Sequence, residues 1–224
     1  MRASVLEPST VKTADSAPSV MDALRDSTKD MHNDTEGHEF QRSLGGGTLD
    51  KERYVTYLEQ LYLMHKHLAE LLGKCAENNK AIDAVVQDYH HDHSAVLGDL
   101  KYFGVDGSQA KPLAATTKIC AQMDQYAGST ALGLLGHLYV LEGSTNGAKF
   151  MAKNIIAGMG LPQDQGASYF DRYGDKQRER WTAFKERMNA NNFSQSDIDL
   201  IVAAGKEMFI AFFEIGDELS KAPQ

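Results

Sequence analysis

The chain has 224 residues, of which 42% are hydrophobic and 24% charged, and its net charge is −8. This length and composition are typical of one large globular domain with a substantial core. The acidic balance disfavours nucleic-acid binding, and no apolar run approaches the roughly 20 residues that a membrane-spanning helix needs. We therefore expect a cytoplasmic protein with no nucleic-acid and no membrane partner.

The N-terminal region is expected to be a loose arm. Residues 1–18 are rich in proline, serine and threonine and lack periodicity, which predicts a flexible arm ahead of a helical domain at 19–222. Ser19 and Asp22 then resemble a capping box, a common start of a helix. The expected buried stripe of this helix, on whose side His32 also lies, consists of Leu24, Thr28, Met31 and Thr35.

The remaining periodic segments also predict helices. Gly45 to Gly47 interrupt the chain, and a 3.6-residue period then indicates a long helix from about Asp50. Later helices are expected to begin near Pro112, after Ser129, near residue 168 and at Ser194. The helix that starts near residue 168 is expected to run to about residue 190. No segment predicts a strand, so the fold class is all-α, a single-domain multi-helix bundle.

His32 is unusual because it occupies a helix face that should be buried. Glu36 follows four residues later, one turn along the same face. A neutral imidazole is the commonest nitrogen ligand of metals and the usual proximal ligand of heme iron. A ligating histidine normally donates its other N–H to an oxygen acceptor, which Glu36 could provide directly or through water. The alternative, an ordinary core histidine, remains open on these residues alone.

Two glycines interrupt the strongly helical segment YVLEGSTNGAKF. Gly143 and Gly147 stand four residues apart and share one helix face, and each costs about 1 kcal/mol relative to alanine. They would let the backbone approach a flat ligand closely, or let the helix bend, with the Ser144 hydroxyl beside them. A close helix–helix crossing explains the same spacing, so both interpretations stand.

Basic residues at helical spacing suggest an anion site. Arg25 and Lys29 precede His32 on the first helix, and Lys185 lies late in the chain with other basic residues. Such groups bind a ligand with two carboxylates, as heme has in its propionates. A solvated charged face is the alternative.

Two segments resemble the heme oxygenase family, in its bacterial branch. LRDSTKDMHNDTEGHEF is similar to the N-terminal helix of that family, and LYVLEGSTNGAKFMAK is similar to its distal helix. The resemblance extends over roughly residues 20 to 220, where HDHSAVLGDLKYFG and FKERMN add less specific matches. It implies a heme held between a proximal N-terminal helix and a kinked distal helix.

The resemblance also implies roles for individual residues. His32 would be the proximal ligand of the heme iron, with Glu36 as its hydrogen-bonding partner. Gly143 and Gly147 would let the distal helix lie on the porphyrin, with Ser144 in contact with it. The residues expected to meet the propionates are Arg25, Lys29 and Lys185.

The family reaction opens the heme ring to biliverdin, carbon monoxide and ferrous iron, so heme is both cofactor and substrate. Electrons would come from a ferredoxin, a flavodoxin or an NADPH-linked reductase, and the family suggests a monomer. This chain departs from the family at two positions. It lacks the distal-helix aspartate that many members have, the animal ones especially; the nearest acid is Glu142, a candidate catalytic group that the bacterial branch shares. Asn146 stands where the bacterial pattern usually has an apolar residue before the second glycine.

Other histidines compete as metal ligands. His38 lies six residues after His32 and should face another direction; Glu36 and the apolar stripe favour His32. His90 and His93 are spaced to share a metal, but no second ligand cluster accompanies them. We expect a solvated turn there, and no metal apart from heme iron.

Three functions remain: a heme-degrading oxygenase, a heme-binding protein without turnover, and a thiaminase-like hydrolase of the wider helical superfamily. The hydrolase needs an activated cysteine. Cys75 and Cys120 both lie in apolar helix-like runs without a charge motif, as buried free thiols do, so this function ranks last.

Overall fold

The computed structural model describes residues 18–163 and 165–221, and within these ranges every regular element is helical. The α-helices are α1 (Val20–Gly37), α2 (Glu39–Gly45), α3 (Lys51–Ala76), α4 (Lys80–Val85), α5 (Ser94–Tyr102), α6 (Ala114–Ala127), α7 (Gly133–Met159), α8 (Gln177–Ala190) and α9 (Gln195–Lys221). Short 3-10 turns are η1 (Asp88–His91), η2 (Gly107–Gln109), η3 (Ser168–Asp171) and η4 (Gly174–Lys176). The all-α prediction is confirmed; residues 1–17 of the expected arm lie outside the described residues.

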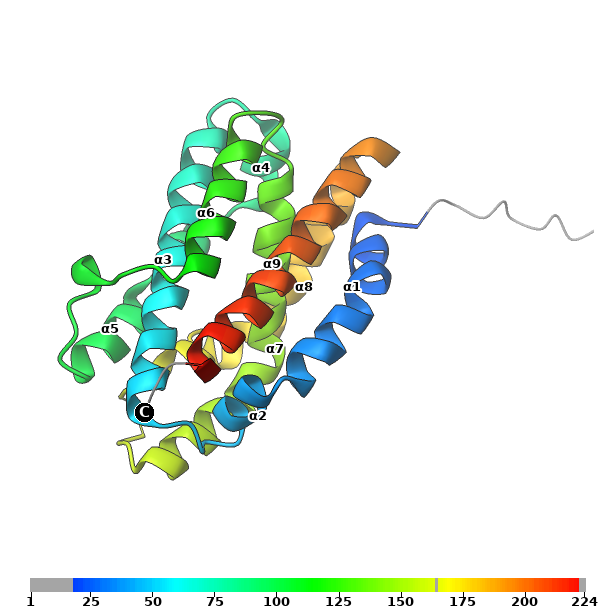
Figure 1. The fold of residues 1–224 in the computed structure, drawn as a ribbon. Helices are drawn as coiled ribbons and strands as arrows, with labels where there is room; N and C mark the ends of the chain where they lie inside the picture. Colours follow the sequence, from blue (N-terminus) through cyan, green and yellow to red (C-terminus); the bar gives the residue numbers. More distant parts are fainter. Residues whose placement is uncertain (1–17, 164, 222–224) are drawn as a thin grey trace, which may run out of the picture.

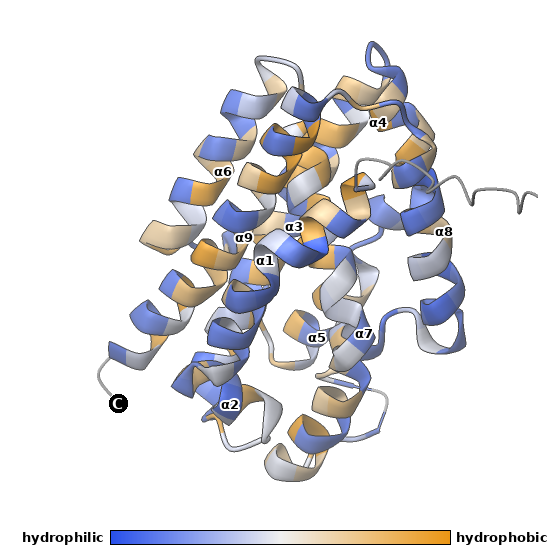
Figure 2. Ribbon diagram, turned by 90° about the vertical axis from the view of Figure 1, so that its right-hand side faces the viewer, coloured by the Kyte–Doolittle hydropathy of each residue, from blue (hydrophilic) through white to orange (hydrophobic). Residues whose placement is uncertain are grey.

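The predicted start of α1 is confirmed. The Ser19 hydroxyl accepts the N–H of Asp22 at 3.2 Å, which satisfies one of the free amides of the first turn. The buried residues of α1 extend only as far as Thr28. After Thr28, Met31 and Thr35 are partly buried and the other residues of the helix are exposed. Figure 2 shows α1 and α2 coloured mainly as polar. The second half of α1 is therefore able to line a cavity.

Helix α9 holds both α1 and α7, and Figure 1 shows these two helices beside it. The closest approach is at Gly136 of α7, where an added Cβ would lie 2.0 Å from the carbonyl oxygen of Ile201 on α9. Gly205 of α9 faces the same point. Glycine is required here because no side chain fits between the two backbones. The close helix crossing on α7 is thus at Gly136, about two turns before Gly143 and about three turns before Gly147.

The prediction of one continuous helix over 168–190 is wrong. The segment consists of η3, η4 and α8. Gly174, the first residue of η4, has a φ of +50°, a conformation that side-chain-bearing residues rarely adopt. Asp99 on α5 accepts the N–H groups of Ser168 at 2.9 Å and Tyr169 at 2.8 Å, which fixes the first of these turns. The interruption brings η3 against α7 instead of extending α8.

The glycine break before α3 is confirmed, with Gly47 at a φ of +70°. Among the described residues, no helix combines the length and apolarity that a bilayer span requires.

Candidate functional site

A cavity of about 710 Å³ lies between α1 and α7 and is closed by side chains from α3, η3, α8 and α9. A volume of this size is typical of a small-molecule or cofactor site. The α1 residues that line it are Arg25, Thr28, Lys29, His32, Asn33, Thr35 and Glu36. The α7 residues that line it are Tyr139, Val140, Gly143, Ser144, Asn146, Gly147, Ala148 and Met151. The two predicted helices therefore do face one another across one cavity.

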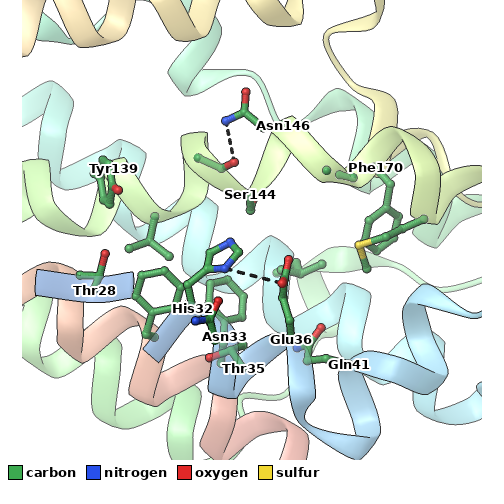
Figure 3. A pocket seen from close by; sticks show the side chains of 18 of the residues that line it. Thr28, His32, Asn33, Thr35, Glu36, Gln41, Tyr139, Ser144, Asn146 and Phe170 are labelled. Carbon is green, nitrogen blue, oxygen red and sulfur yellow. Dashed lines mark hydrogen bonds and ion pairs between the residues drawn. The ribbon is translucent and has the colours of Figure 1, made fainter. Parts of the chain in front are cut away.

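His32 extends from α1 into this cavity, and its side chain is 55% exposed there within the described part of the chain. Its Nδ1 lies 3.7 Å from Glu36 Oε2, a distance longer than a direct hydrogen bond. The edge of its ring packs against Phe209 of α9, with ring centroids 6.0 Å apart. Figure 3 shows the imidazole turned toward α7, with Ser144 opposite. The expected burial of this face is thus replaced by exposure to a cavity.

The glycines of α7 leave the opposite wall of the cavity bare. An added Cβ at Gly147 would meet no atom within 4 Å, and one at Gly143 would meet only the Trp181 ring, at 3.5 Å. A helix crossing at these two glycines is therefore excluded. The Ser144 hydroxyl donates to the carbonyl oxygen of Leu141 at 2.8 Å, so its lone pairs remain able to accept.

The predicted basic residues take different places. Arg25 lines the cavity, but its guanidinium is paired with Asp22 at 2.9 Å and with Asp26 at 2.8 Å, and these carboxylates raise the pKa of Arg25. Lys29 lines the cavity one turn further on. Lys185 does not line it; its ammonium lies 6.0 Å from the ring centroid of Trp181, which does.

Glu142 does not line the cavity. Its carboxylate is buried, accepts a hydrogen bond from the Tyr173 hydroxyl at 2.8 Å and lies 3.2 Å from Arg172 Nη2. Burial raises the pKa of Glu142, while Arg172 and Tyr173 oppose that rise. Arg172 itself is a cavity residue and also donates to the carbonyl oxygen of Leu141 at 3.3 Å. Glu142 therefore affects the cavity only through its ion pair with the guanidinium of Arg172, which lines the cavity.

The expectation of a solvated turn is wrong for His90. His90 is buried, its Nδ1 accepts the N–H of Gln87 at 2.9 Å, and its Nε2 lies 3.9 Å from Glu142 Oε2. In the described ranges no group of three or more histidine, cysteine, aspartate or glutamate residues is arranged to hold a metal ion. His90 thus belongs to the buried polar cluster around Glu142.

His38, the competing ligand, is engaged on both ring nitrogens. Its Nδ1 accepts the N–H of Phe40 at 3.2 Å as the cap of α2, and its Nε2 lies 3.1 Å from Asp217 Oδ1 on α9. A histidine used in this way joins the end of α1 to α9. His38 does not line the cavity, which favours His32 as the candidate ligand.

His90 should make the protein less stable in mild acid. Burial, followed by nearby positive charges, lowers the pKa of His90 to about 3. As the pH falls, His90 of the unfolded chain takes up a proton before His90 of the folded protein does. The stability that the neutral, buried His90 contributes is therefore complete above about pH 6.5 and is lost as the pH falls toward 3. The shift corresponds to about 2 kcal/mol between pH 7 and pH 5.

Urea unfolding of the wild type and of His90→Gln at these two pH values measures the effect. The variant should lose about 2 kcal/mol less than the wild type over the interval. Equal losses in both proteins would mean that His90 is not held neutral by burial.

Several cavity residues were not found from the sequence. They are Gln41 on α2, Tyr57 and Leu61 on α3, Tyr169 and Phe170 in η3 with Arg172 directly after it, Trp181 on α8, and Phe209 and Phe212 on α9. Tyr169 is further tied to His65, whose Nε2 lies 2.8 Å from its hydroxyl. The one available signal was Trp181, the single tryptophan, four residues before the predicted Lys185. Tyr169, Phe170 and Arg172 were hidden by the wrongly predicted continuous helix.

The class of protein that these features define is an all-α bundle with a ligand cavity between its N-terminal helix and a glycine-bearing internal helix. A family model described as Heme oxygenase matches residues 19–218. The chain therefore belongs to the heme oxygenase family.

The relatives are distant. Heme oxygenase 1 of Bos taurus is 23% identical over 203 residues, covering 88% of this chain and 70% of that protein. The structure of heme oxygenase from Leptospira interrogans is 22% identical, covers 90% of this chain and 100% of its own, and gives a TM-score of 0.82. Heme oxygenase-1 from Synechocystis sp. PCC6803, solved in complex with heme, is 20% identical with the same TM-score and covers 90% and 92% of the two chains. These structures establish the fold.

Proposed function

We propose that this chain is a heme oxygenase that cleaves heme to biliverdin, carbon monoxide and ferrous iron, with molecular oxygen and reducing equivalents as co-reactants. The observation that carries the proposal is the placement of the His32 imidazole opposite the Gly143–Gly147 turn, across a cavity of about 710 Å³. Membership of the heme oxygenase family supports the same reaction.

The residues present fit a heme. An imidazole enters the cavity from one side, while on the other a Cβ at Gly147 would project into open space. A flat ring needs this combination of one ligand and one bare wall. Aromatic and aliphatic side chains that line the space, such as Phe209 and Phe212, suit the porphyrin faces and edges.

Each residue contributes a distinct interaction in this proposal. His32 would hold the heme iron through its imidazole, and Glu36, whose Oε2 lies 3.7 Å from His32 Nδ1, would orient the ring. The iron of the bound heme supplies oxygen activation. The backbone at Gly143 and Gly147 allows α7 to lie close to the ring, and Ser144 offers its hydroxyl oxygen there. Arg25 and Lys29, which line the cavity, would attract the propionates directly, and Lys185, which does not line it, would contribute only its positive charge.

Glu142 has an indirect role in this proposal. Its carboxylate, together with the Tyr173 hydroxyl, compensates and orients the buried guanidinium of Arg172. Arg172 then presents a fixed positive charge at the cavity wall. The distal acid predicted from the sequence therefore acts as a positioning residue.

The rival hydrolase is disfavoured by the state of the cysteines. Burial raises the pKa of Cys120 to about 11 and raises that of Cys75 as well, so neither is a ready thiolate at neutral pH. Neither cysteine lines the cavity.

Titration of the purified protein with hemin, followed by ascorbate or by ferredoxin with its reductase in air, tests the proposal. We expect a Soret band that saturates at one hemin per chain and then decays as a broad red biliverdin band grows. A stable Soret band under these conditions would instead identify a heme-binding protein without turnover. Absence of any Soret band would remove heme from the account. Comparison of ferredoxin, flavodoxin and an NADPH-linked reductase at equal concentration would identify the donor class.

A further inference from the structure

The first residue of α8 is hydrogen-bonded to the glycine turn of α7. The side-chain amide nitrogen of Gln177, Nε2, donates to Thr145 Oγ1 at 2.9 Å and to Asn146 Oδ1 at 2.8 Å. A side-chain amide has two N–H donors, so both are used on α7. This contact joins two helices that both line the cavity, since Asn146 of α7 and Trp181 of α8 are among the lining residues.

The two bonds continue into the backbone of α7. The Thr145 hydroxyl donates to the carbonyl oxygen of Glu142 at 2.7 Å, and the Asn146 amide nitrogen donates to that of Gly143 at 2.9 Å. Figure 3 shows the Asn146 amide lying above α7 on the side away from His32. A reversed Asn146 amide would set oxygen against oxygen and nitrogen against nitrogen, so one orientation is selected. Two parallel donor chains therefore run from Gln177 to two consecutive carbonyls.

These carbonyls matter because they belong to the turn that bears the two glycines. In a regular α-helix the Gly143 carbonyl also accepts the N–H of Gly147. Side-chain donors that share such a carbonyl tend to bend the helix locally. Glycines provide no side chains of their own to set the backbone position. The distance between the α7 backbone at Gly143–Gly147 and a ligand in the cavity thus depends on the hydrogen bonds that the carbonyl oxygens of Glu142 and Gly143 accept.

We infer that Gln177 is a positioning residue for the cavity: through Thr145 and Asn146 it fixes the glycine turn of α7 over the bound heme. The ligand in this inference rests on the proposed function, but the clamp itself is a property of the protein alone. Asn146, the polar departure from the family pattern, serves as the connector between α8 and the Gly143 carbonyl.

Hydrogen exchange of Gln177→Leu without ligand tests the clamp. Loss of one net hydrogen bond lowers protection about five- to tenfold, and we expect this at the amides of residues 145–147. In the hemin complex, transfer of hemin to an excess of apomyoglobin should accelerate by a similar factor. With Asn146→Leu already present, Gln177→Leu should add less to either effect, because part of its route is gone.

Gln195→Leu is the matched control. Gln195 is the first residue of α9, as Gln177 is of α8, and it bonds only to the exposed Asp199, at 2.8 Å, among the described residues. This variant should leave both measurements unchanged.

Three results would overturn the inference. Unchanged exchange at 145–147 would mean that Gln177 holds nothing, and a uniform increase over all helices would mean general destabilisation. Faster local exchange with unchanged hemin transfer would mean that the clamp does not position the ligand wall. Failure of the wild type to bind hemin would be seen first, in its own spectrum; it would end the proposed function and the heme part of this inference, while the exchange measurement would still test the clamp.

Discussion

Replacement of His32 by alanine is expected to abolish heme turnover. The substitution removes the only imidazole among the described residues that line the cavity, so the iron would lose its protein ligand. Changing even a partner of a metal ligand lowers affinity about 10- to 100-fold, and loss of the ligand should cost at least as much. The half-exposed side chain makes little contribution to packing, so thermal unfolding of the heme-free variant should match that of the wild type. Hemin titration and aerobic reduction measure the two losses.

Added imidazole separates ligation from other causes of this loss. It should enter the space left by the His32 side chain and restore part of the Soret spectrum and of the turnover. His91→Ala, which changes an exposed histidine outside the cavity, should behave as the wild type. Full turnover in His32→Ala without imidazole would show that the ligand assignment is wrong.

Gly147→Leu is expected to separate ligand binding from stability. A Cβ at Gly147 meets no atom of the described residues within 4 Å, and glycine is less favourable in a helix than leucine by up to about 1 kcal/mol, so the heme-free protein should become slightly more stable. In the complex the leucine side chain would occupy the space between α7 and the ring. Overpacking of this kind costs about 1–3 kcal/mol, which corresponds to a roughly 5- to 150-fold loss of hemin affinity. Thermal unfolding and hemin titration give the two numbers.

Gly98→Leu is the control for the helix-propensity effect. Gly98 lies in α5, is exposed, and an added Cβ there also meets nothing within 4 Å. This variant should gain similar stability and bind hemin as the wild type does. Hemin affinity in Gly147→Leu equal to that of Gly98→Leu would show that the bare wall of α7 does not face the ligand.

The sequence was sufficient for the parts of the fold and site that depend on local pattern. Helical periodicity predicted α3 and α9, and the Ser19 cap predicted the start of α1. His32 was recognisable because it is a polar residue on a helix face that should be buried. Gly143 and Gly147 were recognisable because glycine is unfavourable inside a helix. Such violations are expected where a cavity replaces a protein neighbour.

The remaining parts depend on contacts between distant segments. Asp99 caps a turn about 70 residues later, and Gly174 adopts a positive φ that interrupts the helix predicted over 168–190. Those two features bring Arg172 to the cavity, and Arg172 in turn gives Glu142 its buried place. Periodicity within one segment carries no information about such pairings, so the orientation of Glu142 and the burial of His90 could not be read from the sequence.

Carbon monoxide released in a single turnover tests the central claim most directly. The protein is loaded with one equivalent of hemin, reduced in air with ferredoxin and its reductase, and the gas is quantified together with the biliverdin spectrum. The account predicts about one carbon monoxide and one biliverdin per heme, and neither from His32→Ala. A Soret band that persists through reduction in air, with no carbon monoxide released, would contradict the assignment of this chain as a heme-cleaving enzyme.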